Sequence, residues 1–96
     1  EHDGARAAIT EAVRLGAQCS TLLFVAYQAW EVEAALRAGD APMAADRMTA
    51  LARIAPLISS ARVGAHIADV YRLSGRWAGL PEMHDAREHL RSVIRA

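Results

Sequence analysis

The sequence contains no lysine, one cysteine and no excess of either charge. All eleven basic residues are arginine, and eleven acidic residues balance them, so the formal net charge is zero. A nucleic-acid-binding protein normally carries a basic surplus, and an anionic membrane surface attracts one, so both partners are disfavoured. The single Cys19 excludes an intrachain disulfide and a metal site built from thiolates. The exclusive use of arginine has two explanations that the sequence leaves open, namely contacts at an interface or a GC-rich coding bias.

Aromatic residues, glycine and proline are also scarce. Of the 96 residues, 53% are hydrophobic but only 5% are aromatic, with six glycines and three prolines. The apolar content is therefore aliphatic and above all alanine, the best helix former. The longest apolar run, residues 22–27, is far too short to span a membrane. We expect a cytoplasmic protein, and the start at Glu1 suggests a mature product or a piece of something longer.

Helical periodicity and punctuation predict an all-α fold in one domain, residues 1–96. Three helical stretches are expected, at about 5–38, 42–73 and 81–95. Gly39 is placed to end the first stretch, Asp40 to cap the second, and Pro81 to begin the third. Pro56 interrupts the second stretch, where the apolar stripes before and after it do not align, so we expect a kink or break near 56–60. The stretches should pack as an antiparallel helical bundle.

The first stretch is apolar nearly all round from Leu22 onward, and two other stretches can cover only part of it. We therefore expect another chain or a second copy to complete the bundle, which predicts a homo-oligomer or an obligate protein partner. Within this segment, Val25 and Val32 are predicted to be the most exposed. The predicted partner or ligand interface comprises Leu22, Phe24, Val25, Tyr27, Trp30, Val32 and Leu36.

No catalytic signature is present, so no catalytic residue is assigned. On the last stretch, His84 and Glu88 are four residues apart, as are Asp85 and His89, which could place two metal ligands on one face. Metal sites in helical bundles draw ligands from several facing helices, however, and no second cluster exists here. We interpret this region as a solvated face, with His84, Glu88 and His89 as weak candidate ligands.

Three segments resemble a known family when taken in order. A long helix contains Tyr27-Gln28-Ala29-Trp30, a later helix ends in the turn Leu73-Ser74-Gly75-Arg76-Trp77-Ala78-Gly79, and a helix with His84-Asp85-Ala86-Arg87 follows. This order is similar to the C-terminal helical bundle of the flavin-dependent acyl-CoA dehydrogenase superfamily. There, a Leu-x-Gly-Gly-x-Gly turn precedes a helix with Arg-Asp-Ala-Arg. The present chain departs at Arg76, which replaces the second glycine, and at His84, which replaces the first arginine.

The resemblance implies a role in subunit assembly, because that bundle builds the tetramer core of the family. It also implies that Gly75, Arg76 and Gly79 would approach FAD in a longer, acyl-CoA dehydrogenase-like oxidoreductase. The catalytic glutamate segment and the β-domain of the family are missing from this sequence, so we expect no cofactor for this chain alone.

Three functions therefore remain open. The first is a non-catalytic helical assembly or oligomerisation module, free-standing or excised from such a flavoprotein. The second is a bundle that binds a small apolar ligand or an acyl group in a pocket lined by residues 22–30. The third is a metal-dependent enzyme that uses the C-terminal helix.

Overall fold

The computed structural model describes residues 2–95, apart from the side chains at positions 2, 3, 5, 6, 12, 17–19 and 95. Its four α-helices are α1 (His2–Arg37), α2 (Ala41–Ile54), α3 (Ala61–Ser74) and α4 (Pro81–Arg95). Two short 3₁₀ helices follow α2 and α3, namely η1 (Ala55–Leu57) and η2 (Gly75–Trp77). Residues 2–95 contain no strand, and the prediction of an all-α fold is confirmed. In the same range, no helix combines the length and the hydrophobicity that crossing a membrane requires.

The turn between α1 and α2 follows from its local chemistry. Gly39 has a φ of 76°, a left-handed conformation that glycine adopts without steric cost. Its N–H donates to the carbonyl of Leu36, and the next N–H donates to the carbonyl of Ala35, both at 3.0 Å. Asp40 then caps α2, because its Oδ1 accepts a hydrogen bond from the N–H of Met43 at 3.2 Å.

The second predicted stretch is two separate helices. Pro56 has no N–H to continue the α-helical hydrogen bonding, and the chain tightens into η1 before Ile58 becomes extended (φ −127°, ψ 157°). Ser60 caps the new helix, because its Oγ accepts a hydrogen bond from the N–H of Val63 at 3.3 Å. The chain thus reverses at the position where a kink or break was expected, and the number of helices is four rather than three.

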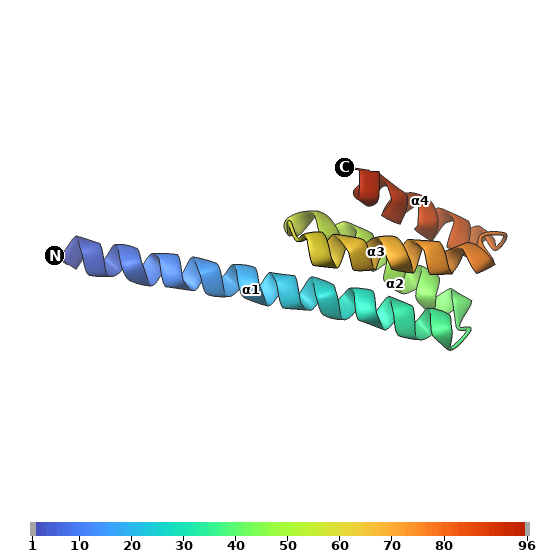
Figure 1. The fold of residues 1–96 in the computed structure, drawn as a ribbon, viewed down its shortest axis with the longest axis horizontal. Helices are drawn as coiled ribbons and strands as arrows, with labels where there is room; N and C mark the ends of the chain where they lie inside the picture. Colours follow the sequence, from blue (N-terminus) through green and yellow to red (C-terminus); the bar gives the residue numbers. More distant parts are fainter. Residues whose placement is uncertain (1, 96) are drawn as a thin grey trace.

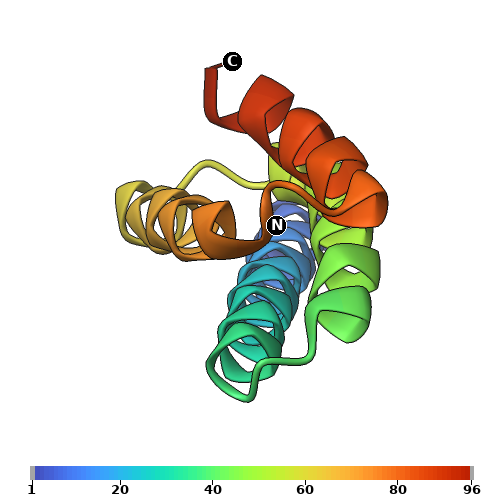
Figure 2. The same ribbon diagram turned by 90° about the vertical axis from the view of Figure 1, so that its right-hand side faces the viewer.

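Consecutive helices run in opposite directions, and α2 packs against both α1 and α4 (Figure 1). Helix α3 also packs against α1 and α4, on another side of α1 from α2 (Figure 2). The N-terminal half of α1 projects beyond the other helices (Figure 1). The molecule consequently measures 62 × 25 × 19 Å. We call residues 2–20 of α1 the arm and residues 21–95 the body.

The core contains no fully buried aromatic side chain among the described residues. Its largest fully buried side chains are Met48, Leu51, Met83, Leu90, Val25, Val32 and Val70. Between them lie buried alanines, which include Ala29 on α1, Ala44 on α2 and Ala86 on α4. Small side chains at these contacts allow the helices to approach one another closely. The five aromatic residues therefore lie at the edge of the core or outside it.

One ion pair joins α1 to α3. His66 Nε2 donates a hydrogen bond to Glu33 Oε1 at 2.8 Å, and both side chains are partly buried. Arg37 Nε donates to the other oxygen of Glu33 at 3.1 Å. The hydrogen bond from His66, and after it that from Arg37, holds the pKa of Glu33 below its usual value of 4.5.

Substitution of Gly64 by alanine is expected to stabilise the protein by about 0.5–1 kcal/mol, because glycine within a helix has an entropic cost. Nothing lies within 4 Å of a Cβ built at this position. The matched change Gly39→Ala should instead cost roughly 1–2 kcal/mol, because it forces a Cβ into the left-handed region. Urea denaturation measures both. Equal effects of the two substitutions would contradict the assigned backbone conformations.

Replacement of Glu33 by glutamine should lower stability by a few tenths to about 1 kcal/mol at pH 7. Because the folded-state pKa of Glu33 is lowered, its contribution is present above pH 4.5 and is lost as the pH falls through the lowered value. The difference between wild type and Glu33→Gln should therefore shrink below pH 4.5 in urea denaturation. Glu88→Gln, which removes an exposed pair within α4, is the control and should have the smaller effect at neutral pH. A difference between Glu33→Gln and wild type that is constant from pH 3 to 7 would refute the role of this pair.

Candidate functional site

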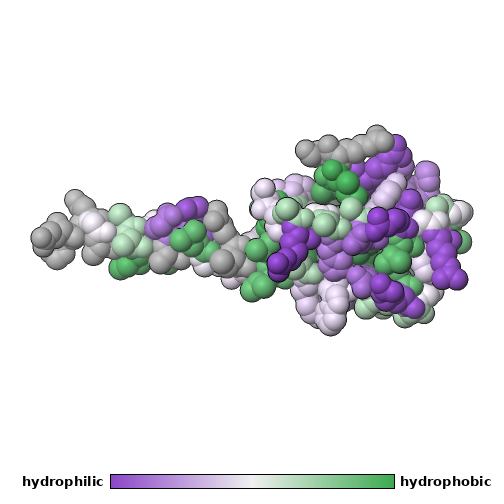
Figure 3. All heavy atoms as spheres, viewed as in Figure 1, coloured by the Kyte–Doolittle hydropathy of each residue, from purple (hydrophilic) through white to green (hydrophobic). Residues whose placement is uncertain are grey.

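Four large apolar side chains lie exposed on one side of α1, within the body. The exposed fractions are 69% for Leu23, 54% for Phe24, 53% for Tyr27 and 62% for Trp30. These side chains line a shallow hollow that is wide open to solvent. Hydrophobic residues are visible along the arm and where it meets the body (Figure 3). We call these four residues the exposed face of α1.

The opposite side of α1 is buried against α2 and α3. Val25 and Val32 are completely inaccessible, and Leu36 is 3% exposed. The prediction that Val25 and Val32 are the most exposed interface residues is therefore wrong. Both side chains point into the core of their own chain, because α2 and α3 pack against this side of α1. A charge at either position would disrupt the core rather than test an interface.

The remaining predicted interface residues divide according to the helical repeat of 100° per residue. Phe24, Tyr27 and Trp30 belong to the exposed face, whereas Leu22 is half-buried against the core. Leu23, which the predicted interface omitted, joins them and has the largest exposed fraction. Its spacing of four residues from Tyr27 and seven from Trp30 is the signal that identifies it.

A polar contact borders the exposed face on the side of α2. Glu31 lies 3.6 Å from Arg47 of α2. The hydrogen bond between Tyr27 and Glu31 raises the pKa of the Tyr27 hydroxyl above its usual value of 10.0, and the negative charge of Glu31 acts in the same direction. Tyr27 thus stays a neutral phenol at physiological pH and presents its ring to solvent.

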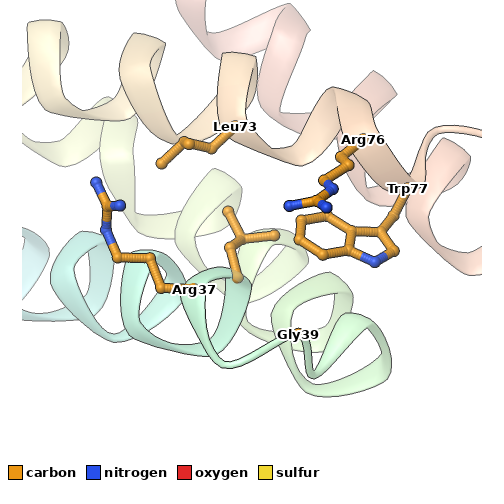
Figure 4. A pocket seen from close by; sticks show the side chains of 6 residues that line it. Arg37, Gly39, Leu73, Arg76 and Trp77 are labelled. Carbon is orange, nitrogen blue, oxygen red and sulfur yellow. The ribbon is translucent and has the colours of Figure 1, made fainter.

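A second hollow lies between the C-terminal end of α1 and the turn that follows α3, and it has a volume of about 440 Å³. Figure 4 shows Arg37 and Arg76 on opposite sides of it, with Leu73 between them and Trp77 beneath Arg76. The Arg76 guanidinium lies 5.7 Å from the centre of the Trp77 ring. Of the three residues that the family resemblance assigns to FAD, Arg76 lines this hollow.

The other two predicted cofactor residues face different surroundings. A Cβ built on Gly75 would lie 3.6 Å from the guanidinium of Arg87, whereas one on Gly79 would have no atom within 4 Å. Gly75, Arg76 and Gly79 therefore do not line one common pocket in the described part of the chain. The close approach at Gly75 is to the chain's own Arg87.

Arg87 links α4 to the C-terminal end of α3 through hydrogen bonds, a role that was not predicted from the sequence. Its Nη1 donates hydrogen bonds to the carbonyl of Tyr71 and to Oγ of the fully buried Ser74. The guanidinium also lies 4.0 Å from the centre of the Tyr71 ring, which suits the planar arginine group. Arg87, part of the His-Asp-Ala-Arg segment, therefore has a structural role in this chain.

The weak candidate metal ligands lie on the outer surface of α4. His84, Glu88 and His89 are all exposed. His89 Nδ1 donates to the carbonyl of Asp85 at 2.8 Å, and Glu88 accepts from Arg91 at 3.4 Å. Within the described part of the chain, no group of three histidine, cysteine or acidic side chains is arranged to hold a metal ion.

A cavity of about 510 Å³, with a mixed lining of aliphatic residues and serines, lies where the loop before α3 meets the C-terminal end of α4. Ile58 and Ile67 contribute one wall, and Val93 and Ile94 contribute another. This cavity is distinct from residues 22–30, the segment that the sequence suggested as a pocket lining.

Comparison with protein-family models, with curated proteins and with solved structures found no match to this chain.

Proposed function

We propose that this chain is a non-catalytic helical assembly module, which self-associates through the exposed face of α1. The observation that carries the proposal is the position of the aromatic residues. Three of the five in the sequence, Phe24, Tyr27 and Trp30, lie side by side in solvent on one helix. Aromatic side chains are enriched at the centres of protein interfaces, where they contribute most of the binding energy.

The energetic argument favours coverage of this face. Burial of apolar surface is worth about 25 cal/mol per Å², and a buried aromatic side chain removes about 150–250 Å² from water. The half-exposed aromatic residues and Leu23 together represent several kcal/mol, against a net stability of about 5–15 kcal/mol for a whole domain. The proposal applies equally to a free-standing chain and to part of an acyl-CoA dehydrogenase-like flavoprotein, where the family resemblance also implies subunit assembly.

The test is the substitution Leu23→Glu, followed by sedimentation equilibrium. A carboxylate buried at an interface without a partner costs about 2–5 kcal/mol, so self-association should weaken by at least about 30-fold. Leu57→Glu is the matched control, because Leu57 is also 69% exposed but belongs to η1 and not to the exposed face of α1. Circular dichroism should show that both variants remain helical.

Two outcomes would contradict the proposal. One is a wild-type chain that sediments as a monomer at every concentration, and the other is equal weakening by Leu23→Glu and Leu57→Glu.

The cavity that residues 55–60 form with α3 and α4 favours a second candidate function, the binding of a small apolar or acyl ligand. Its volume of about 510 Å³ lies within the usual range of ligand pockets, about 300–1,000 Å³. Two isoleucines and a valine from α3 and α4, with Ile58, give part of the lining an aliphatic surface suited to a hydrocarbon chain. Ser59 and Ser60 add hydroxyl groups beside it.

For this second candidate, a fluorescent fatty acid titrated into the protein should bind and be displaced by unlabelled fatty acid. Ile94→Glu should reduce the affinity by at least about tenfold, because it places a charge beside the hydrocarbon chain. Ser92→Glu, exposed on α4 and outside the lining, should leave affinity unchanged. If the two variants bind equally well, the cavity is not the binding site.

A further inference from the structure

The exposed face of α1 continues into the arm as one stripe. Ile9 and Val13 are 65% and 66% exposed and lie on the same side of the helix as Tyr27. The steps between successive stripe positions alternate between four and three residues, which is the heptad spacing of helices that pair along their length. The stripe consists of Ile9, Val13, Gly16, Ser20, Leu23, Tyr27 and Trp30.

The arm extends beyond the helices that cover the body (Figure 1). Every residue of the arm whose side chain the structure describes is exposed. The side of the arm that continues the core-facing side of α1 is polar, and it carries the ion pair between Glu11 and Arg14. Most of the stability of a helix in a protein comes from the packing of its apolar side and not from helix propensity. The apolar side of the arm is therefore suited to a partner outside the chain, on the side away from α2 and α3.

Side-chain size changes systematically along the stripe. Branched aliphatic residues lie towards the N-terminus, the small Gly16 and Ser20 occupy the middle, and two large aromatic residues lie towards the C-terminus. Two paired helices keep a nearly constant separation of about 8–10 Å, so a large side chain must face a smaller one. Two stripes that run antiparallel provide this match, because the aromatic end of each stripe then faces the aliphatic end of the other.

We infer that the partner is a second copy of this chain, bound antiparallel along α1 about a two-fold axis near Ser20. This inference rests on the proposed function and specifies the geometry of the assembly. In this arrangement Ile9 faces Trp30 of the second copy, Val13 faces Tyr27, and Gly16 faces Leu23. Each pair is centred on Ser20 to within half a residue. A parallel pair would instead set tryptophan against tryptophan and glycine against glycine.

The arrangement places the arm of each copy along the exposed face of the other. That face is accessible, because α2, α3 and α4 lie above or beside α1 in both views (Figures 1 and 2). Six large side chains of each copy would be covered, namely those of the exposed face together with Ile9 and Val13. From their exposed fractions they contribute on the order of 500 Å² per copy. The total of about 1,000 Å² reaches the size at which specific interfaces begin.

The test uses two complementary charge substitutions, Ile9→Glu and Trp30→Arg. Each places an unpaired charge against an apolar side chain in both contacts of an antiparallel homodimer, so each variant alone should lose at least about 30-fold in association constant. An equimolar mixture should form a heterodimer, because one contact then pairs glutamate with arginine and the other keeps isoleucine against tryptophan. Native mass spectrometry and sedimentation equilibrium measure both. Ala7→Glu, on the polar side of the arm, is the control and should dimerise like the wild type.

The outcomes separate this inference from the proposed function. If both variants are monomeric and their mixture also stays monomeric, the antiparallel pairing is wrong while assembly through α1 stands. If the wild type itself is a monomer, or if both variants dimerise as well as the wild type, the inference and the proposed function fail together.

Discussion

The structure depends on how much of one long helix its neighbours can cover. Helix α1 has 36 residues, more than twice the length of any other helix in the described chain. Helices α2 and α3 bury one side of its C-terminal half, where Val25, Ala29 and Val32 enter the core. They cannot reach the other side or the arm. The core and the exposed face therefore have the same cause, because helices this short can cover only one side of half of α1.

The alanine-rich core explains where the aromatic residues lie. Helices that meet through alanine, such as Ala44 on α2 and Ala86 on α4, leave little space for a ring between them. Tyr71 and Trp77 are accordingly half-buried at the rim of the core, where Tyr71 supports the guanidinium of Arg87. The other three rings lie on α1 in solvent. A core built from small side chains thus leaves the aromatic side chains at its rim or in solvent.

Local chemistry was predictable from the sequence, whereas the direction in which each face points was not. Gly39, Asp40 and Pro56 act within one or two turns of the chain, and the structure places a turn, a helix cap and a helix end at these positions. The burial of Val25 depends instead on where α2 and α3 settle around α1, which no local pattern specifies.

Long-range contacts explain the remaining difference between sequence and structure. Glu33 and His66 are 33 positions apart and meet only once the body has folded. Arg87 likewise finds the carbonyl of Tyr71 because of the angle between α3 and α4. For the candidate site, the helical repeat places Tyr27 and Trp30 on one side of α1, but the tertiary packing decides that this side stays in solvent.

The continuity of α1 has a thermodynamic consequence. The same helix carries the core contacts of Val32 on one side and the rings of Tyr27 and Trp30 on the other, with no break between the arm and the body. Any molecule that binds the exposed face binds the folded helix and not the unfolded chain. By mass action, such binding adds to the free energy of unfolding of the whole body. The melting temperature of the core is therefore coupled to the concentration of whatever occupies the far side of α1.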